Sequence, residues 1–210
     1  MSTELHPHDP LIEWKGVRFL DPTGKVFVYN GRYYRAIYPH AETFVRSLFS
    51  DGIVEKLCKN NWLVHSKISK DLSMSNFAFV IEHEAESPSP RFKEWPLEMW
   101  KDAAILWLDI NLFLLDFDLG LIDGHQANLI QSKQGFPLFC DLGSIQPIKD
   151  EHVGIKEFLN CFFHPIFFAE KMVKTGCAGL ARNIGPISSQ ASELLRLPGI
   201  KLKSQSSHRI

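Results

Sequence analysis

The chain lacks several features that would assign it at once to a class of protein. Only four cysteines occur in 210 residues, and no two of them form a Cys-x-x-Cys pair. A structural zinc site is therefore not expected, and the wide spacing favours free thiols in a reducing compartment, which predicts a cytoplasmic location. Lys and Arg number 23 against 24 Asp and Glu, so no basic field is available to bind nucleic acid.

No stretch of the sequence is apolar for long enough to cross a membrane. The most apolar stretch, 103–117, contains Asp109 and Asp116, whereas a spanning helix needs about 20 mainly apolar residues. Residues 1–10 are polar and do not resemble a signal peptide. We therefore expect neither a membrane nor a nucleic acid as a partner.

The first part of the chain is predicted to form a sheet. Asn30-Gly31 is a strong signal for a tight hairpin. Helical spacing of apolar residues at 41–49 and 53–60 predicts two helices. Segments rich in β-branched and aromatic residues predict five strands, at 17–20, 25–29, 32–37, 63–68 and 77–82.

A proline-rich segment, 87–90, separates this part from a helical one. A helix is predicted from Pro96 to about Leu119, buried in the second lobe because its middle is apolar nearly all round, with Gly120 as its C-cap. The fold class is α+β. We divide the chain into an N-terminal extension (1–16), a β-rich lobe (17–86), a helical lobe (87–198) and a disordered tail (199–210).

A second hairpin is predicted from the apolar runs 129–131 and 136–140. If its turn centres between Gln134 and Gly135, residues whose numbers sum to 269 face each other, and Asn128 lies opposite Asp141. Two oxygen ligands on adjacent strands suit Mg²⁺. Asp123 precedes Asn128 by five residues, on the loop that enters this hairpin.

These residues resemble the motifs of the protein-kinase-like superfamily. The segment 123–128, Asp-Gly-His-Gln-Ala-Asn, resembles the catalytic loop D-x-x-x-x-N, and Asp141-Leu142-Gly143 resembles the D-F-G metal motif. His125 makes the match more specific, because aminoglycoside phosphotransferases and choline kinases use the form D-x-H-x-x-N. The chain is also similar, over 19–37, to kinase-like domains that precede class I methyltransferase domains in some bacterial chains.

The resemblance implies a bilobal kinase-like fold, with a five-stranded antiparallel first lobe and a truncated helical second lobe. It also implies ATP and Mg²⁺ as cofactors, with Asn128 and Asp141 as metal ligands. Asp123 would orient or deprotonate the hydroxyl group of an unknown small-molecule or sugar-like acceptor. His125 would order the loop or contact phosphate.

The same resemblance assigns phosphate contacts to the β-rich lobe. Arg35 would stand in for the strand lysine of kinases, with Glu42 or Glu55 as its carboxylate partner. Gly24 is the one glycine in the turn that takes the place of the glycine-rich loop.

The adenine would lie near residues 80–84, where we expect backbone groups of Glu82 and Glu84 to be free for hydrogen bonds. The run Glu82-His83-Glu84 also looks like a set of metal ligands. Alternation along a strand, however, puts His83 on the opposite face from its neighbours.

Two functions stay open. The set Asp123, Asn128 and Asp141 favours an ATP-dependent phosphotransferase. The absence of a G-x-G-x-x-G loop, Arg35 in place of lysine and the short helical lobe favour a catalytically inactive kinase-like module that binds nucleotide or a partner such as a methyltransferase.

Overall fold

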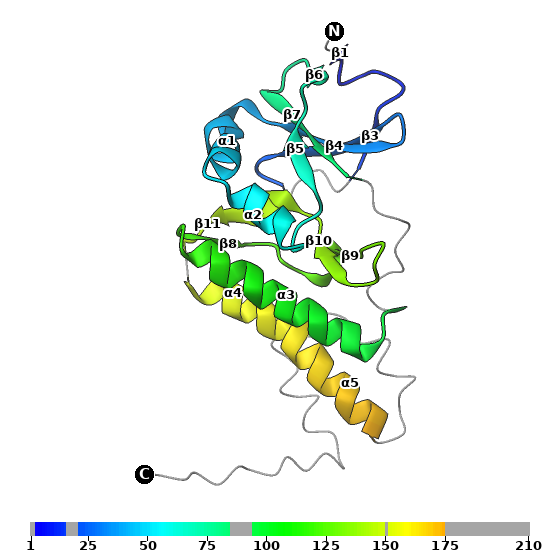
Figure 1. Cartoon of the computed structure of the whole chain (residues 1–210), viewed down its shortest axis with the longest axis vertical. Helices are drawn as coiled ribbons and strands as arrows, with labels where there is room; N and C mark the ends of the chain where they lie inside the picture. The colour runs from blue at the N-terminus through cyan, green and yellow to red at the C-terminus, as the bar shows by residue number, and fades with distance from the viewer. Residues whose placement is uncertain (1–2, 16–20, 85–93, 150, 175–210) are drawn as a thin grey trace.

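The computed structural model describes residues 3–15, 21–84, 94–149 and 151–174. A sheet forms one side of the molecule, three helices that lie close together form the other, and two short two-stranded sheets lie between them (Figure 1). The mixed α+β fold class is confirmed.

The sheet is antiparallel and has five strands in the order β2-β3-β4-β7-β5. The turn between β3 and β4 contains Asn30 and Gly31, both with positive φ, as the hairpin prediction requires. The predicted strand 17–20 lies outside the described residues, and β2, from the predicted extension, forms the edge beside β3. The strands are β2 (Glu13–Trp14), β3 (Gly24–Tyr29), β4 (Arg32–Ile37), β5 (Ser66–Ile68) and β7 (Phe79–His83).

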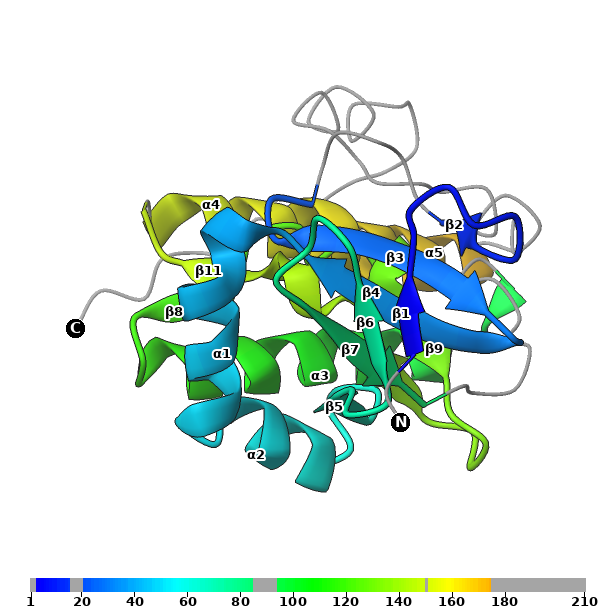
Figure 2. The same ribbon diagram turned by 90° about the horizontal axis from the view of Figure 1, so that it is seen from above.

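The two faces of the sheet are buried by different partners. On the outer face, a parallel pair formed by β1 (Thr3–Leu5) and β6 (Leu72–Met74) encloses a small apolar cluster that includes Phe27 and Val80 (Figure 2). On the inner face, Ile37 and Ile81 join the larger core. Alternation along the strands separates these two sets, so Arg35, between Tyr34 and Ala36, shares the inner face.

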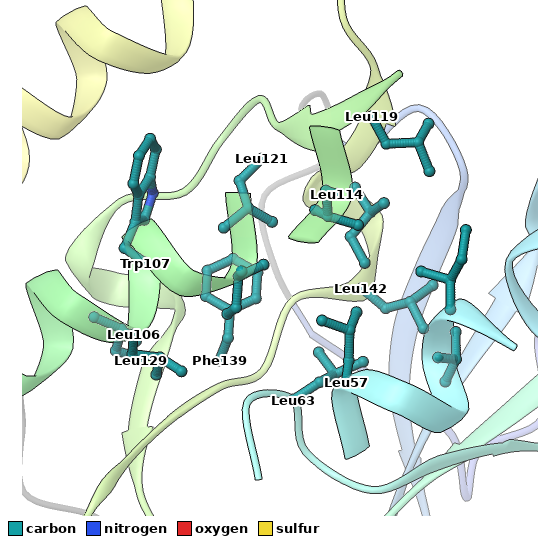
Figure 3. Close-up of a cluster of buried hydrophobic side chains, with 14 of the residues drawn as sticks. Leu57, Leu63, Leu106, Trp107, Leu114, Leu119, Leu121, Leu129, Phe139 and Leu142 are labelled. Carbon is teal, nitrogen blue, oxygen red and sulfur yellow. The ribbon is translucent and has the colours of Figure 1, made fainter. Parts of the chain in front are cut away.

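The larger core connects the sheet to the helices. It takes apolar side chains from α1 (Glu42–Ser50), α2 (Ile53–Lys59) and α3 (Leu97–Leu115), together with both two-stranded sheets. Figure 3 shows Leu142 lying between Leu114 of α3 and Leu57 of α2, with Trp107 farther along α3. On the far side of α3 lie α4 (Glu151–Phe158), a π-helical turn (Leu159–Phe163) and α5 (His164–Lys174).

Two predictions for α3 are wrong. The helix ends at Leu115, and Asp118, with φ of 56°, turns the chain into β8 (Leu119–Leu121). Gly120 is part of this strand and not a C-cap; Ile148 and Asn111 approach it closely. The helix is also not buried on nearly all sides, because one apolar face is exposed to solvent.

Two short two-stranded sheets lie between the five-stranded sheet and α3. One pairs β8 with β11 (Ile145–Pro147), and the chain between these two strands forms the other, the hairpin of β9 (Leu129–Gln131) with β10 (Pro137–Phe139). Among the helices of the described residues, none combines the length and hydropathy that a bilayer span requires.

Candidate active site

The loop before β9 and the turn after β10 bring three predicted site residues together. Nδ2 of Asn128 donates hydrogen bonds to the carbonyl oxygen of Asp123 at 2.6 Å and to Oδ2 of Asp141 at 3.4 Å. The prediction that Asn128 and Asp141 approach each other, with Asp123 close by, is therefore confirmed.

The register from which we predicted this approach is wrong by one residue. Gln131 pairs with Pro137, so the numbers of facing residues sum to 268, and Asn128 lies opposite Cys140. The reason is the turn: it is a three-residue loop in which Gly135 takes a φ of 91°, and not a two-residue loop. The side chains of Asn128 and Asp141 still meet, because both residues lie just past the strand ends, where strict alternation no longer applies.

Ser144 completes this cluster and was missed by the sequence analysis. Its buried Oγ lies 2.6 Å from Oδ2 of Asp141 and 3.1 Å from the carbonyl oxygen of Asp123. It therefore links the loop before β9 to the turn after β10. The sequence indicates this role only through spacing: Ser144 follows Asp141 by three residues. Asp141 caps a 3₁₀ turn over 142–144, and one such turn brings the two side chains together.

Arg35 reaches this cluster from the inner face of the sheet. Its side chain is 3% exposed and forms ion pairs with Asp21 through Nη1 and with Asp141 through Nη2. The prediction that Arg35 points toward Asp141 is confirmed. The prediction of its partner is wrong: Asp21 holds the position that we assigned to Glu42 or Glu55.

Local geometry explains why Asp21, and not a helix carboxylate, pairs with Arg35. Oδ1 of Asp21 accepts hydrogen bonds from the backbone N–H and the hydroxyl of Thr23, at 2.8 and 2.7 Å, which fix the carboxylate at the start of β3. Glu42 instead pairs with Arg46 one turn along α1, at 2.8 Å. The sequence Asp21-Pro-Thr-Gly indicated where this carboxylate lies, because an Asp at the first position of such a turn accepts hydrogen bonds from the residues of the turn.

Gly143 allows the Arg35 guanidinium to lie against the turn after β10. A Cβ atom at this position would lie 2.3 Å from Nη1 of Arg35 and 2.6 Å from Oδ1 of Asp21. The glycine of the Asp141-Leu-Gly motif is therefore required here for close approach of the ion pair.

Asp141 accepts hydrogen bonds from Arg35, Asn128, Gly143 and Ser144. Burial alone would raise its pKa, but the charge of Arg35 and the hydrogen bonds from Ser144 and the Gly143 N–H outweigh burial and lower it. Asp141 is therefore ionised at neutral pH, as a metal ligand must be.

His83 is buried next to this charged group. Its Nδ1 lies 2.8 Å from Oγ of Ser66, and its Nε2 has no hydrogen-bond partner among the residues that the structure describes. Burial, followed by the charge of Arg35, lowers the pKa of His83 to about 3, so the ring is neutral.

The side chain of Asp123 points to the more open part of the site. Its carboxyl is 44% exposed and lies 3.4 Å from Nε2 of His125. Nδ1 of His125 accepts a hydrogen bond from the N–H of Ala127, so the ring proton resides on Nε2 and faces Asp123. His125 therefore orders the loop, one of its two predicted roles.

Glu157 on α4 is a third residue that the sequence analysis missed, after Ser144 and Asp21. Burial raises its pKa to about 7; the N–H of Gly124 hydrogen-bonds to the carboxyl and opposes this rise, while the nearby charge of Asp123 adds to it. Nothing in the sequence marks Glu157, because α4 and the loop meet only in the tertiary structure.

Three other residues were predicted to contact the nucleotide. They lie outside this cluster, or their backbone groups already form hydrogen bonds within the protein. Glu82 is on the outer face of the sheet, where it pairs with Arg32 and Lys67, and its strand is bonded on both sides. The N–H of Glu84 donates to the carbonyl of His65 at 2.8 Å. The expectation of free backbone groups is therefore wrong for Glu82 and for the N–H of Glu84. Gly24 begins β3 and leaves room for the carbonyl oxygen of Ala36.

The donor set fits a hard cation. Asp141 supplies an ionised carboxylate, and Asn128 has an amide oxygen that no hydrogen bond among the described residues uses. The described residues contain no group of three or more His, Cys, Asp and Glu side chains that could hold a metal ion. Mg²⁺ does not need one, since it is commonly bound through one or two carboxylates and the phosphates of a substrate.

No protein-family model and no curated protein sequence matches this chain.

Proposed function

We propose that this protein is a kinase-like, ATP-dependent phosphotransferase that acts on a hydroxyl group of a small molecule or sugar-like acceptor. The observation that carries the proposal is the convergence of Arg35 and Asn128 on the carboxylate of Asp141 from distant parts of the chain. Phosphoryl transfer depends on positioning and on compensation of charge, and little covalent chemistry is required of the protein.

Each residue has a role that its surroundings support. Asp141 and Asn128 would bind Mg²⁺, which compensates the charge of the ATP phosphates. Arg35 is buried beside them and would contact phosphate from the sheet side. Asp123, with its exposed carboxyl, would receive the proton of the acceptor hydroxyl.

One observation favours a second candidate, a kinase-like module that binds nucleotide or a partner such as a methyltransferase without turnover. Arg35 is held between Asp21 and Asp141, so two carboxylates already compensate its charge. Mg²⁺ would have to compete with this guanidinium for Asp141, which would weaken metal binding.

Replacement of Asp123 distinguishes the two candidates. We expect Asp123→Ala to lower the rate of phosphate release or transfer by about 10²–10⁴-fold, the usual contribution of a proton acceptor. Nucleotide affinity, measured by calorimetry, should change little. Sugars, choline and aminoglycosides serve as acceptors, and Asp71→Ala, at an exposed position before β6, is the matched control.

Binding and turnover of Mg·ATP by the unmodified protein decide between the two candidate functions. Binding of Mg·ATP without turnover above a control lacking enzyme, for every acceptor, would replace the phosphotransferase by the binding module. If the parent neither binds nor turns over nucleotide, both candidates fail.

A further inference from the structure

One face of α3 is apolar and exposed to solvent. Ile105, Leu108, Leu112 and Leu115 are 56%, 39%, 64% and 53% exposed, respectively. Their spacing of three, four and three residues puts them on one side of the helix, as in the seam of a coiled coil. We call these four residues the α3 stripe. An apolar stripe of this kind on a helix surface marks a site of interaction.

A groove runs along one edge of the α3 stripe. Its volume is about 380 Å³, and it lies between α3, the loop after α2 and hairpin β9–β10. Asp102 and Asp109 line it, with Ile105, Trp62 and Phe136. Asp116 continues the same edge with the same seven-residue spacing, and no described residue forms an ion pair with any of these three aspartates. The edge therefore suits a cationic partner.

We propose that the α3 stripe and this acidic groove bind residues 194–203 of the same chain. This segment, Leu-Leu-Arg-Leu-Pro-Gly-Ile-Lys-Leu-Lys, combines five Leu and Ile residues with three basic residues and has no acidic residue. Its apolar side chains complement the stripe, and Arg196, Lys201 and Lys203 complement the aspartates. The proposal does not depend on the proposed enzymatic function.

The end of the described chain lies close to the start of the α3 stripe. Lys101, one turn before Ile105, pairs with Glu170 of α5 at 2.8 Å, and α3 and α5 lie side by side (Figure 1). Between Lys174, the last residue of α5, and Leu194 there are 19 residues, which span up to ~60 Å when extended. The stripe is only ~15 Å long, so segment 194–203 can reach all of it.

A second exposed apolar row offers a comparison. Ile155, Leu159 and Phe163, on α4 and the π-helical turn, are also exposed, but Lys156 lies beside them and no row of aspartates does. Charge therefore favours the α3 stripe as the binding site of the basic segment.

Carbodiimide cross-linking of the full chain tests the proposal, because it joins a carboxylate only to an amine that contacts it. We expect cross-links from Asp102 or Asp109 to Lys201 or Lys203, identified by mass spectrometry. Leu112→Glu should lower their yield about tenfold, since it puts a charge in the apolar contact. Leu115→Glu should act in the same way, and Ile155→Glu, the matched control, should not.

Mixing of isotopically labelled and unlabelled protein identifies the occupant. Cross-links within one chain support the proposal. Cross-links between labelled and unlabelled chains would overturn it and assign the stripe to a second copy. The absence of these cross-links, or an equal yield in Leu112→Glu and the parent, would also overturn it. Circular dichroism of each variant verifies that the chain is folded.

Discussion

Arg35 is the residue on which the candidate site depends. An unpaired guanidinium on a side chain that is only 3% exposed would be very costly, and the two carboxylates of Asp21 and Asp141 make its burial possible. Removal of one carboxylate leaves Arg35 with a single partner. Changes at Asp21 and Asp141 therefore affect both stability and any ligand that needs Arg35.

Asp141→Asn should weaken the binding of ATP in the presence of Mg²⁺ far more than in its absence. The substitution replaces a charged oxygen ligand by a neutral one next to a hard cation. Calorimetry with and without Mg²⁺ measures both affinities. Equal affinity of the variant and the parent for Mg·ATP would contradict the assignment of Asp141 as a metal ligand.

His83 should make the protein less stable as the pH falls below about 6.5. Its pKa is about 3 in the folded state and near 6.5 when unfolded, so the unfolded chain binds one more proton between these values. The free energy of unfolding then falls by about 1.4 kcal/mol for each pH unit. Urea unfolding between pH 7.5 and 4.5 should show this slope. In His83→Gln, the free energy of unfolding should depend less steeply on pH. An equal slope in both proteins would exclude burial of a neutral His83.

At the scale of elements, the pairing of β3 with β4 depends on a glycine. A Cβ atom on Gly24 would lie 2.3 Å from the carbonyl oxygen of Ala36, a backbone atom that cannot move without distortion of the sheet. We therefore expect Gly24→Ala to lower the free energy of unfolding by about 1–3 kcal/mol. Chemical denaturation measures this change.

Gly154→Ala is the matched control for this substitution. Gly154 lies within α4, and a Cβ atom there would make an ordinary contact with Trp107 at 3.8 Å. In a helix, alanine is favoured over glycine by about 0.5–1 kcal/mol, so this variant should be more stable than the parent. A loss of stability in both variants, or in neither, would contradict the argument.

The elements themselves were largely predictable from local signals. The β3–β4 hairpin follows from Asn30-Gly31, and hairpin β9–β10 from two short apolar runs around Gly135. The register error came from the turn, since the positive φ of Gly135 depends on a loop length that the sequence does not specify. The exposed face of α3 was not predictable either, because the helix is apolar on nearly all sides and its pattern does not show which face has a partner.

At the scale of the whole molecule, the candidate site combines residues from separate parts of the chain. The motif residues Asp123, Asn128 and Asp141 could be found from their spacing. Asp21 left a local signal, its own turn, but its pairing with Arg35 and the place of Glu157 could not be found, because they depend on how the sheet and α4 pack against the loop. Docking of the sheet against α3 through one shared core therefore determines which carboxylates reach the site.

The ion pair between Arg35 and Asp141 has a consequence for folding kinetics, because 106 residues separate its partners, whereas 14 separate Arg35 from Asp21. Contacts across such a long loop form late, after local hairpins. Arg35→Met should therefore leave the folding rate nearly unchanged and accelerate unfolding. Stopped-flow measurements would show this as a shift of the unfolding limb of the chevron alone, and a slower folding limb would indicate that the site forms before the transition state.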